Sequence, residues 1–184
     1  MLTLEFDGLF RGAPQDYHLK DDAGFMCYGW VILRDGVVIA RGHGGYARGH
    51  GASSNVAEYL ALIEGLEALL DLQLTDETVL VCGDAKSIIE QMDGSASVSA
   101  SSIKPLHRRA ARLARHFRSL IWSWTPRRNN HTADALTRRA LRQIRAYPAS
   151  YENAFLLRGR PSARLRSLLD LRMYQTMAPA FAVA

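Results

Sequence analysis

The chain has few of the features that would assign it to a class at once. Its 184 residues include only two cysteines, Cys27 and Cys82, and both lie in apolar runs. We expect buried thiols in a reducing compartment rather than a disulfide framework. No run of about 18 apolar residues occurs, which argues against a membrane span. The opening MLTLEFDG has neither the basic start nor the apolar block of a secretory signal, so a cytoplasmic location is expected.

The phosphate-cradling pattern G-x-x-x-x-G-K-[ST] is also absent, so no nucleotide cofactor is expected. Acidic residues are scarce in the second half of the chain. Residues 104–184 contain 17 Lys+Arg and only 3 Asp+Glu, whereas residues 1–103 contain 6 and 15. This distribution favours a polyanionic partner for the second half, although a solvated arginine-rich surface explains it about equally well.

The remaining composition, 48% hydrophobic and 22% charged, is typical of a globular domain. Its apolar patterning predicts a mixed α/β fold. Strands are expected at residues 2–6, on both sides of the Asp35-Gly36 turn, at 78–82 and at 120–124; helices are expected at 54–71, 84–92, 103–119 and 130–146. Right-handed crossovers place the first and fourth strands side by side and parallel. Their carboxyl ends then share the edge at which open α/β sheets usually carry their sites.

The helix expected over residues 54–71 contains one misplaced carboxylate. Ser54 or Asn55 can cap its start, and a step of about 100° per residue puts Glu64 on the solvent-facing stripe, together with Glu67 and Asp71. By the same count Glu58 lies about 120° away from Glu64, among leucines. The sequence therefore predicts a carboxylate that points toward the protein core.

Three other acids can reach the same edge of the sheet: Asp7 at the end of the first strand, Asp84 after the fourth, and Asp134 in the first turns of the last long helix. Each has an ordinary alternative, because Asp7-Gly8 can be a turn, Asp84 a helix cap, and Asp134 a partner of the helix dipole. Four neighbouring carboxylates repel one another unless cations neutralise them. Oxygen-ligated Mg²⁺ or Mn²⁺ is the natural counterion.

These residues lie in four motifs that resemble those of type 1 ribonucleases H. Asp7-Gly8 with Gly12-Ala13-Pro14 resembles the family's DGxxxGNP, and SSNVAEYLALIEGL resembles TNNxAExxALIxGL. VLVCGDAKSII resembles the family's strand and following D-S-x, and NHTADAL matches NxxADxL. Order and spacing agree across about residues 2–143. The short link from Asp84 to the arginine-rich helix resembles members without the family's extra basic handle.

The resemblance implies a ribonuclease H-like five-stranded mixed sheet, order 3-2-1-4-5, flanked by helices. It also implies a metal-dependent endoribonuclease that cuts the RNA strand of RNA/DNA hybrids to 5′-phosphate and 3′-hydroxyl ends. Two Mg²⁺ or Mn²⁺ ions per site would act together. Their ligands, which are also the catalytic residues, would be Asp7, Glu58, Asp84 and Asp134.

The resemblance further implies recognition of the hybrid by shape, through its wide minor groove. The implied substrate-binding residues are Gly8, Gly12, Ser54, Asn55, Lys86, Arg108 and Arg112. Without the resemblance, Asn55 is better explained as a helix cap and Lys86 as a solvated lysine. Some of the arginines between residues 108 and 118 must face water.

The sequence departs from the family pattern in several places. Ala13 replaces the usual asparagine, and residues 15–24 lengthen a loop and contribute three aspartates that can repel nucleic acid. His131 lies too close to Asp134 to be assigned the family's loop-histidine role. An alternative is therefore a catalytically weak module that binds hybrid or double-stranded RNA. A DNA-cutting nuclease of the same superfold fits the 54–71 helix less well.

The resemblance ends before the carboxyl-terminal part of the chain. We expect a catalytic domain at residues 1–146 and a basic extension at residues 147–184, whose SARLRSLLDLRMY segment predicts an amphipathic helix. Such a helix would clamp substrate, dock on the domain or mediate dimerisation. Its role, the oligomeric state, the preferred metal and the cellular role all stay open.

Overall fold

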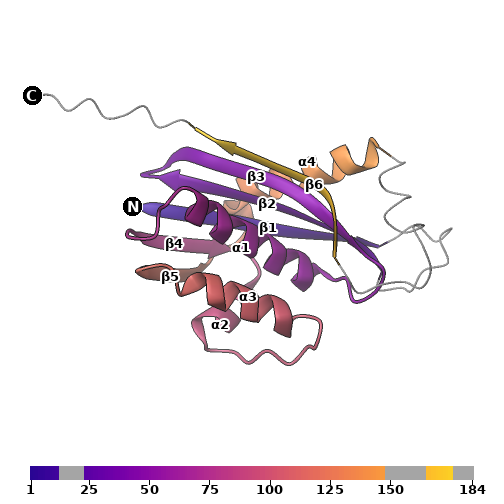
Figure 1. Ribbon diagram of the computed structural model, residues 1–184, viewed down its shortest axis with the longest axis horizontal. Coiled ribbons are helices and arrows are strands. Elements are labelled where there is room, and N and C mark those ends of the chain that lie inside the picture. Colours follow the sequence, from indigo (N-terminus) through magenta and orange to yellow (C-terminus); the bar gives the residue numbers. More distant parts are fainter. Residues whose placement is uncertain (13–22, 148–164, 176–184) are drawn as a thin grey trace, which may run out of the picture.

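The chain folds around a six-stranded mixed sheet, with helices on both faces (Figure 1). The computed structural model describes residues 1–12, 23–147 and 165–175. The strands are β1 (Leu2–Gly12), β2 (Gly24–Arg34), β3 (Val37–Arg48), β4 (Thr78–Gly83), β5 (Ser119–Trp124) and β6 (Arg166–Tyr174). The helices are α1 (Ser54–Asp71), α2 (Lys86–Asp93), α3 (Lys104–Ala114) and α4 (His131–Arg145), with a short 3-10 turn, η2 (Arg127–Asn129).

The strand order is β5-β4-β1-β2-β3-β6, which confirms the expected order of the first five strands and adds a sixth. β4 pairs with β1 and with β5 in parallel. The β2–β3 hairpin turns at Asp35 and Gly36, whose φ angles of 51° and 81° are the left-handed values that such tight turns require. The predicted parallel pairing of β1 and β4 is therefore confirmed, and β4 ends at Gly83 beside Phe6, next to Asp7 of β1.

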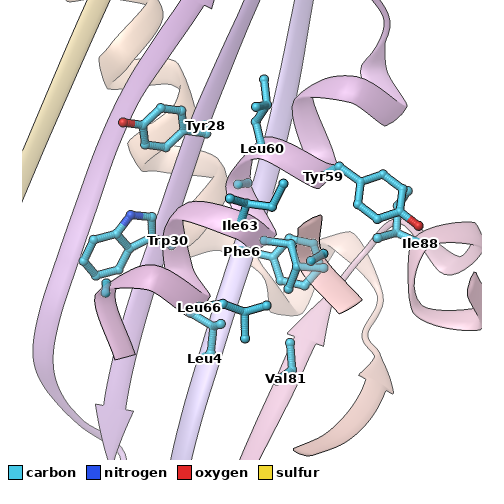
Figure 2. Packing of buried hydrophobic residues seen from close by; sticks show 14 of the residues in the cluster. Leu4, Phe6, Tyr28, Trp30, Tyr59, Leu60, Ile63, Leu66, Val81 and Ile88 are labelled. Atoms are coloured by element: carbon cyan, nitrogen blue, oxygen red, sulfur yellow. The ribbon is translucent and has the colours of Figure 1, made fainter. Parts of the chain in front are cut away.

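Alternation along the strands divides the core between the two faces of the sheet. Leu4 and Phe6 of β1 face α1 and pack against Ile63 and Leu66, as Figure 2 shows. On the opposite face a smaller cluster joins Phe25 and other β2 side chains to α4. Both cysteines are free thiols; Cys27 is buried as expected, whereas Cys82 is only partly buried. The two faces hold α1 and α4 in place on either side of β1.

Two local predictions are wrong. β1 does not end near residue 7 but continues to Gly12, so Asp7 and Gly8 are strand residues paired with Gly29 and Tyr28 rather than a turn. The cap of α1 is Ser53 and not Ser54 or Asn55; its hydroxyl accepts a hydrogen bond from the amide of Val56 at 3.2 Å. A serine one position earlier satisfies the same free amides of the first turn.

The helix predicted in SARLRSLLDLRMY is also wrong. Within the described part of that segment, residues 166–174 form β6, which pairs antiparallel with β3. Without β6, β3 would be an edge strand with unpaired backbone N–H and C=O groups. The extension pairs with these groups by forming a strand. The loop extension at residues 15–24 lies outside the described residues, except for Ala23 and Gly24.

β6 also changes the environment of Glu64, which was expected to face solvent. Glu64 is only 2% exposed. Its carboxylate accepts a hydrogen bond from the Tyr46 hydroxyl and lies 2.7 Å from Nη2 of Arg172 in β6. Arg172 also lies 2.9 Å from Asp71, so one arginine holds the extension against α1. The solvent stripe expected from helix periodicity is therefore partly covered.

Candidate active site

Three carboxylates meet at the shared edge of β1 and β4. Ligand oxygens of Asp7, Glu58 and Asp84 all lie within 4.8 Å of one another. Asp7 lies within β1, Asp84 directly follows β4, and Glu58 is in the second turn of α1. The inward orientation predicted for Glu58 is therefore present, and its side chain is buried together with that of Asp7.

Gly8 is the residue that allows α1 to approach β1 so closely. A Cβ at this position would lie 2.2 Å from the amide nitrogen of Glu58 and 2.3 Å from the carbonyl carbon of Ala57. Any side chain would push the start of α1 away from the strand. A Cβ at Gly12, by contrast, would meet no atom of the described residues within 4 Å, and this residue is exposed. Gly8 therefore positions Glu58 beside Asp7.

The carboxylates share a site that opposes their charge. Burial raises the pKa of Asp7 to about 7, assisted by the charges of Asp84 and Asp134 and opposed by the Thr137 hydrogen bond. Burial, with repulsion from Asp7 and Asp84, raises the pKa of Glu58 well above its usual range. Burial also raises the pKa of Asp84. Ionising all three requires a compensating positive charge.

A divalent cation fits this requirement. The Oε2 atom of Glu58 is buried and has no hydrogen-bond partner among the described residues, a costly arrangement unless a cation or water completes it. Three convergent carboxylates offer the hard oxygen ligands that Mg²⁺ and Mn²⁺ prefer. The neighbouring oxygen donors and the orphaned Glu58 oxygen therefore suit such an ion.

Asp134, the fourth predicted ligand, lies next to this group but is held by two arginines. Its Oδ1 is 2.6 Å from Nη2 of Arg127 and its Oδ2 is 2.7 Å from Nε of Arg138. Partial burial alone would raise its pKa, but the hydrogen bonds from Arg138 and Arg127 outweigh burial and lower it. Asp134 is therefore an ionised carboxylate at the rim of the three-carboxylate group.

Two buried residues of the α4 region connect the site to β1, and sequence reasoning missed both. The hydroxyl of Thr137 is 2.9 Å from Oδ2 of Asp7 and 2.7 Å from the backbone oxygen of Asp134. Asn130 donates from Nδ2 to the Phe6 carbonyl at 2.8 Å. Asn130 begins the NHTADAL motif and Thr137 directly follows it. Their closeness to Asp134 in the sequence is the feature from which a role at the site could have been predicted.

Arg127 was also missed, because it lies in a turn without periodicity. Burial raises the pKa values of Asp7, Glu58 and Asp84, and the positive charge of Arg127 opposes part of that rise. Its side chain is 62% exposed and reaches the site from η2. The guanidinium therefore offsets part of the negative charge of the acidic group.

The predicted substrate contacts lie on the surface near this edge and along α3. Ser54 and Asn55 are exposed at the start of α1. Lys86 is exposed at the start of α2 and lies 3.5 Å from Glu90. Arg108 and Arg112 are exposed on α3 and line a surface cleft of about 620 Å³. All are accessible, but only Ser54, Asn55 and Lys86 lie at helix starts next to the acids.

No described helix of this protein combines the length and apolarity that crossing a membrane requires.

Comparison with known proteins matches most of the chain to a known family. Residues 20–140 match the family model described as reverse transcriptase-like. The bifunctional protein Rv2228c of Mycobacterium tuberculosis is 34% identical over 140 residues, which are 76% of this chain and 35% of the relative. The chain therefore spans about a third of the length of that curated relative.

Solved structures agree with this match. RNase H1 from the archaeon Halobacterium salinarum is 31% identical, with a TM-score of 0.64 over 77% of this chain and 98% of that one. LC11-RNase H1, solved in complex with an RNA/DNA hybrid, is 27% identical, with a TM-score of 0.65 over 78% and 98%. Fold, motifs and these relatives together show that the chain belongs to the type 1 ribonuclease H family.

Proposed function

We propose that this chain is a metal-dependent endoribonuclease that hydrolyses the RNA strand of RNA/DNA hybrids, leaving 5′-phosphate and 3′-hydroxyl ends. The observation that carries the proposal is the convergence of Asp7, Glu58 and Asp84 within 4.8 Å. The hybrid bound by its relative LC11-RNase H1 supports the choice of substrate.

In this proposal Asp7, Glu58 and Asp84 hold divalent cations, with Asp134 as the fourth ligand of a two-ion site for Mg²⁺ or Mn²⁺. Bound cations supply Lewis acidity, which activates water and neutralises the charge that develops on the phosphate oxygens. The protein supplies position and charge. Burial of Glu58 keeps its carboxylate within the site, and Gly8 sets its distance from Asp7.

The substrate would be recognised by its shape. Ser54 and Asn55 project at the start of α1, next to Glu58, where they would contact the minor groove and its 2′-hydroxyls. Because Ser53 caps the helix, the side chain of Asn55 is not used as the cap. Gly8, Gly12 and Lys86 would complete the contacts near the cut, and Arg108 and Arg112 would hold the backbone of the DNA strand in a salt-dependent manner.

We include in the proposal the division into a catalytic domain, residues 1–146, and an extension, residues 147–184. The pairing of β6 with β3, together with the contacts of Arg172 to α1, favours docking of the extension on the catalytic domain. The proposal gives the extension a supporting role for the sheet rather than a catalytic one.

A second candidate function is a catalytically weak module that binds hybrid or double-stranded RNA. The pairing of Asp134 with both Arg127 and Arg138 favours it, since those guanidiniums compete with a cation for the carboxylate. In this case the basic surfaces would carry the function, and the acids would contribute little turnover.

A cleavage panel tests the proposal. End-labelled RNA/DNA hybrid, single-stranded RNA, double-stranded RNA and double-stranded DNA are incubated with the full chain in Mg²⁺, Mn²⁺ or chelator. We expect metal-dependent cutting of the RNA strand of the hybrid alone, with ligatable 5′-phosphate ends. Hybrid binding without cutting in either metal would favour the second candidate, and cutting of duplex DNA would contradict both.

A further inference from the structure

A basic cavity adjoins the acidic site on the α4 face of the sheet. It has a volume of about 290 Å³. Its lining residues are Leu9, Arg11, Arg127, Arg138, Leu141 and Arg142. We call this cavity the arginine pocket. Four guanidiniums and two leucines line it, and no assigned function of the site uses it.

On the strand side, the pocket continues the row that begins with Asp7. Side chains two residues apart in a strand lie on the same face. Asp7 reaches Thr137 of α4, so Leu9 and Arg11 also lie on the α4 face of β1. The pocket is therefore reached from the acidic site by following β1 toward Gly12.

On the helix side, the pocket continues the row that begins with Asp134. Arg138 is four residues later and Arg142 eight residues later, which places all three on one face of α4. Arg127 and Arg138 line the pocket and also contact Asp134 at 2.6 and 2.7 Å. The acidic site and the arginine pocket thus share a wall.

The pocket has more positive charge than its acidic neighbours balance. Asp134 pairs with Arg127 and Arg138. Over residues 1–12, 23–147 and 165–175, no carboxylate forms a salt bridge with Arg11 or Arg142 that would neutralise them. Leu9 and Leu141 supply apolar walls, and the four guanidiniums are exposed, so an anion can reach them from solvent.

We propose that the arginine pocket binds a phosphate of the RNA strand that is being cut, close to the scissile position. Guanidinium groups match phosphate oxygens in bidentate geometry and stay charged at all working pH values. A backbone that crosses the acidic site and continues along β1 and α4 brings its own phosphates into the pocket. This inference rests on the proposed function, because it extends the path of the same substrate beyond the cut.

The test uses the full chain with Arg11→Gln and Arg142→Gln combined, which spares the arginines that contact Asp134. Arg139→Gln combined with Arg145→Gln is the matched control, since it also removes two positive charges, both from exposed positions of α4 outside the pocket. Hybrid binding is measured in chelator over a range of salt concentrations. Loss of one phosphate contact predicts binding about 5- to 10-fold weaker at low salt and a salt slope reduced by about one.

Cleavage kinetics give a second readout. The double variant is expected to raise KM while leaving kcat within about twofold of the wild type, because the pocket binds the substrate away from the reacting atoms. If the double variant melts early, Arg142→Gln alone, on an exposed helix face, serves the same test. Binding and KM equal to those of the matched control, or for Arg142→Gln alone to those of Arg139→Gln alone, would overturn the proposal.

Hybrids with one strand shortened show whether the RNA strand or the DNA strand occupies the arginine pocket. The penalty of the double variant should vanish when the RNA strand ends before it reaches the pocket, and should persist when the DNA strand is shortened equally. The reverse pattern would overturn the assignment to the RNA strand. If the wild type neither binds nor cuts hybrid, the proposed function fails; if the wild type cuts hybrid and the double variant matches its control, only the pocket assignment fails.

Discussion

The hydroxyl of Thr137 lies 2.9 Å from Oδ2 of Asp7, so a residue of α4 orients the carboxylate of β1. The same hydroxyl is 2.7 Å from the backbone oxygen of Asp134. Thr137 is 1% exposed, which fixes its rotamer among packed neighbours. One side chain therefore connects two of the proposed metal ligands.

Removing this hydroxyl should weaken metal binding. Thr137→Val keeps the shape but not the hydrogen bond, and a bond to a charged carboxylate is worth about 1.5–3 kcal/mol. We expect Mn²⁺ affinity, measured by calorimetry, to fall by about tenfold in Thr137→Val and to stay near wild type in Thr137→Ser. Equal affinity of the valine variant and the wild type would show that Asp7 needs no such support.

The raised pKa of Asp7 predicts how stability depends on pH in the absence of metal. Its folded pKa of about 7 exceeds the ordinary value of 3.8, so ionisation is easier in the unfolded chain. The stability that Asp7 contributes to the folded state is therefore fully present below about pH 4, and it is lost as pH rises through about 7. Asp7→Asn, which stays uncharged, should stabilise the chelated protein by roughly 4 kcal/mol at pH 8. Urea unfolding at pH 4 and pH 8 checks this, and a gain of the same size at both values would contradict it.

Gly8 should tolerate no side chain. In Gly8→Ala the new methyl group meets the backbone of Ala57 and Glu58, so α1 must shift. Overpacking of this kind costs about 1–3 kcal/mol. Gly12→Ala, in the same strand and with no described atom within 4 Å of the new methyl group, is the control. We expect Gly8→Ala to lower both the melting temperature and the Mn²⁺ affinity relative to Gly12→Ala; indistinguishable variants would mean that the strand and helix adjust freely.

Arg172 should stabilise the fold through Glu64. The Glu64 side chain is 3% exposed and the Arg172 side chain 23%, so the pair is largely shielded. Arg172→Met leaves the buried Glu64 carboxylate with the Tyr46 hydrogen bond but without its nearest positive charge, which costs about 3 kcal/mol. Combining it with Glu64→Gln should recover part of that loss, as measured by urea unfolding. If the changes in unfolding free energy of the two single variants simply add in the double variant, Arg172 and Glu64 do not stabilise the fold through their mutual contact.

Local pattern and topology were sufficient to predict that Asp7, Glu58 and Asp84 lie close together. The β1–β4 crossover and the inward angle of Glu58 are set by strand order and helix period, and both were correct. The contacts of Arg127, Thr137 and Arg172 depend instead on side chains distant in sequence, which no local period records. The leucines of β6 fit a helix as well as a strand, and only the open edge of β3 decides between them.

The most direct measurement compares Asp84→Asn with Asp76→Asn in single-turnover cleavage of an RNA/DNA hybrid, with hybrid binding measured in parallel. Asp84 belongs to the three-carboxylate group, whereas Asp76 is exposed and outside it. We expect Asp84→Asn to lose cleavage in Mg²⁺ and Mn²⁺ while still binding hybrid, and Asp76→Asn to match the wild type. Undiminished cleavage by Asp84→Asn would contradict the assignment of the active site.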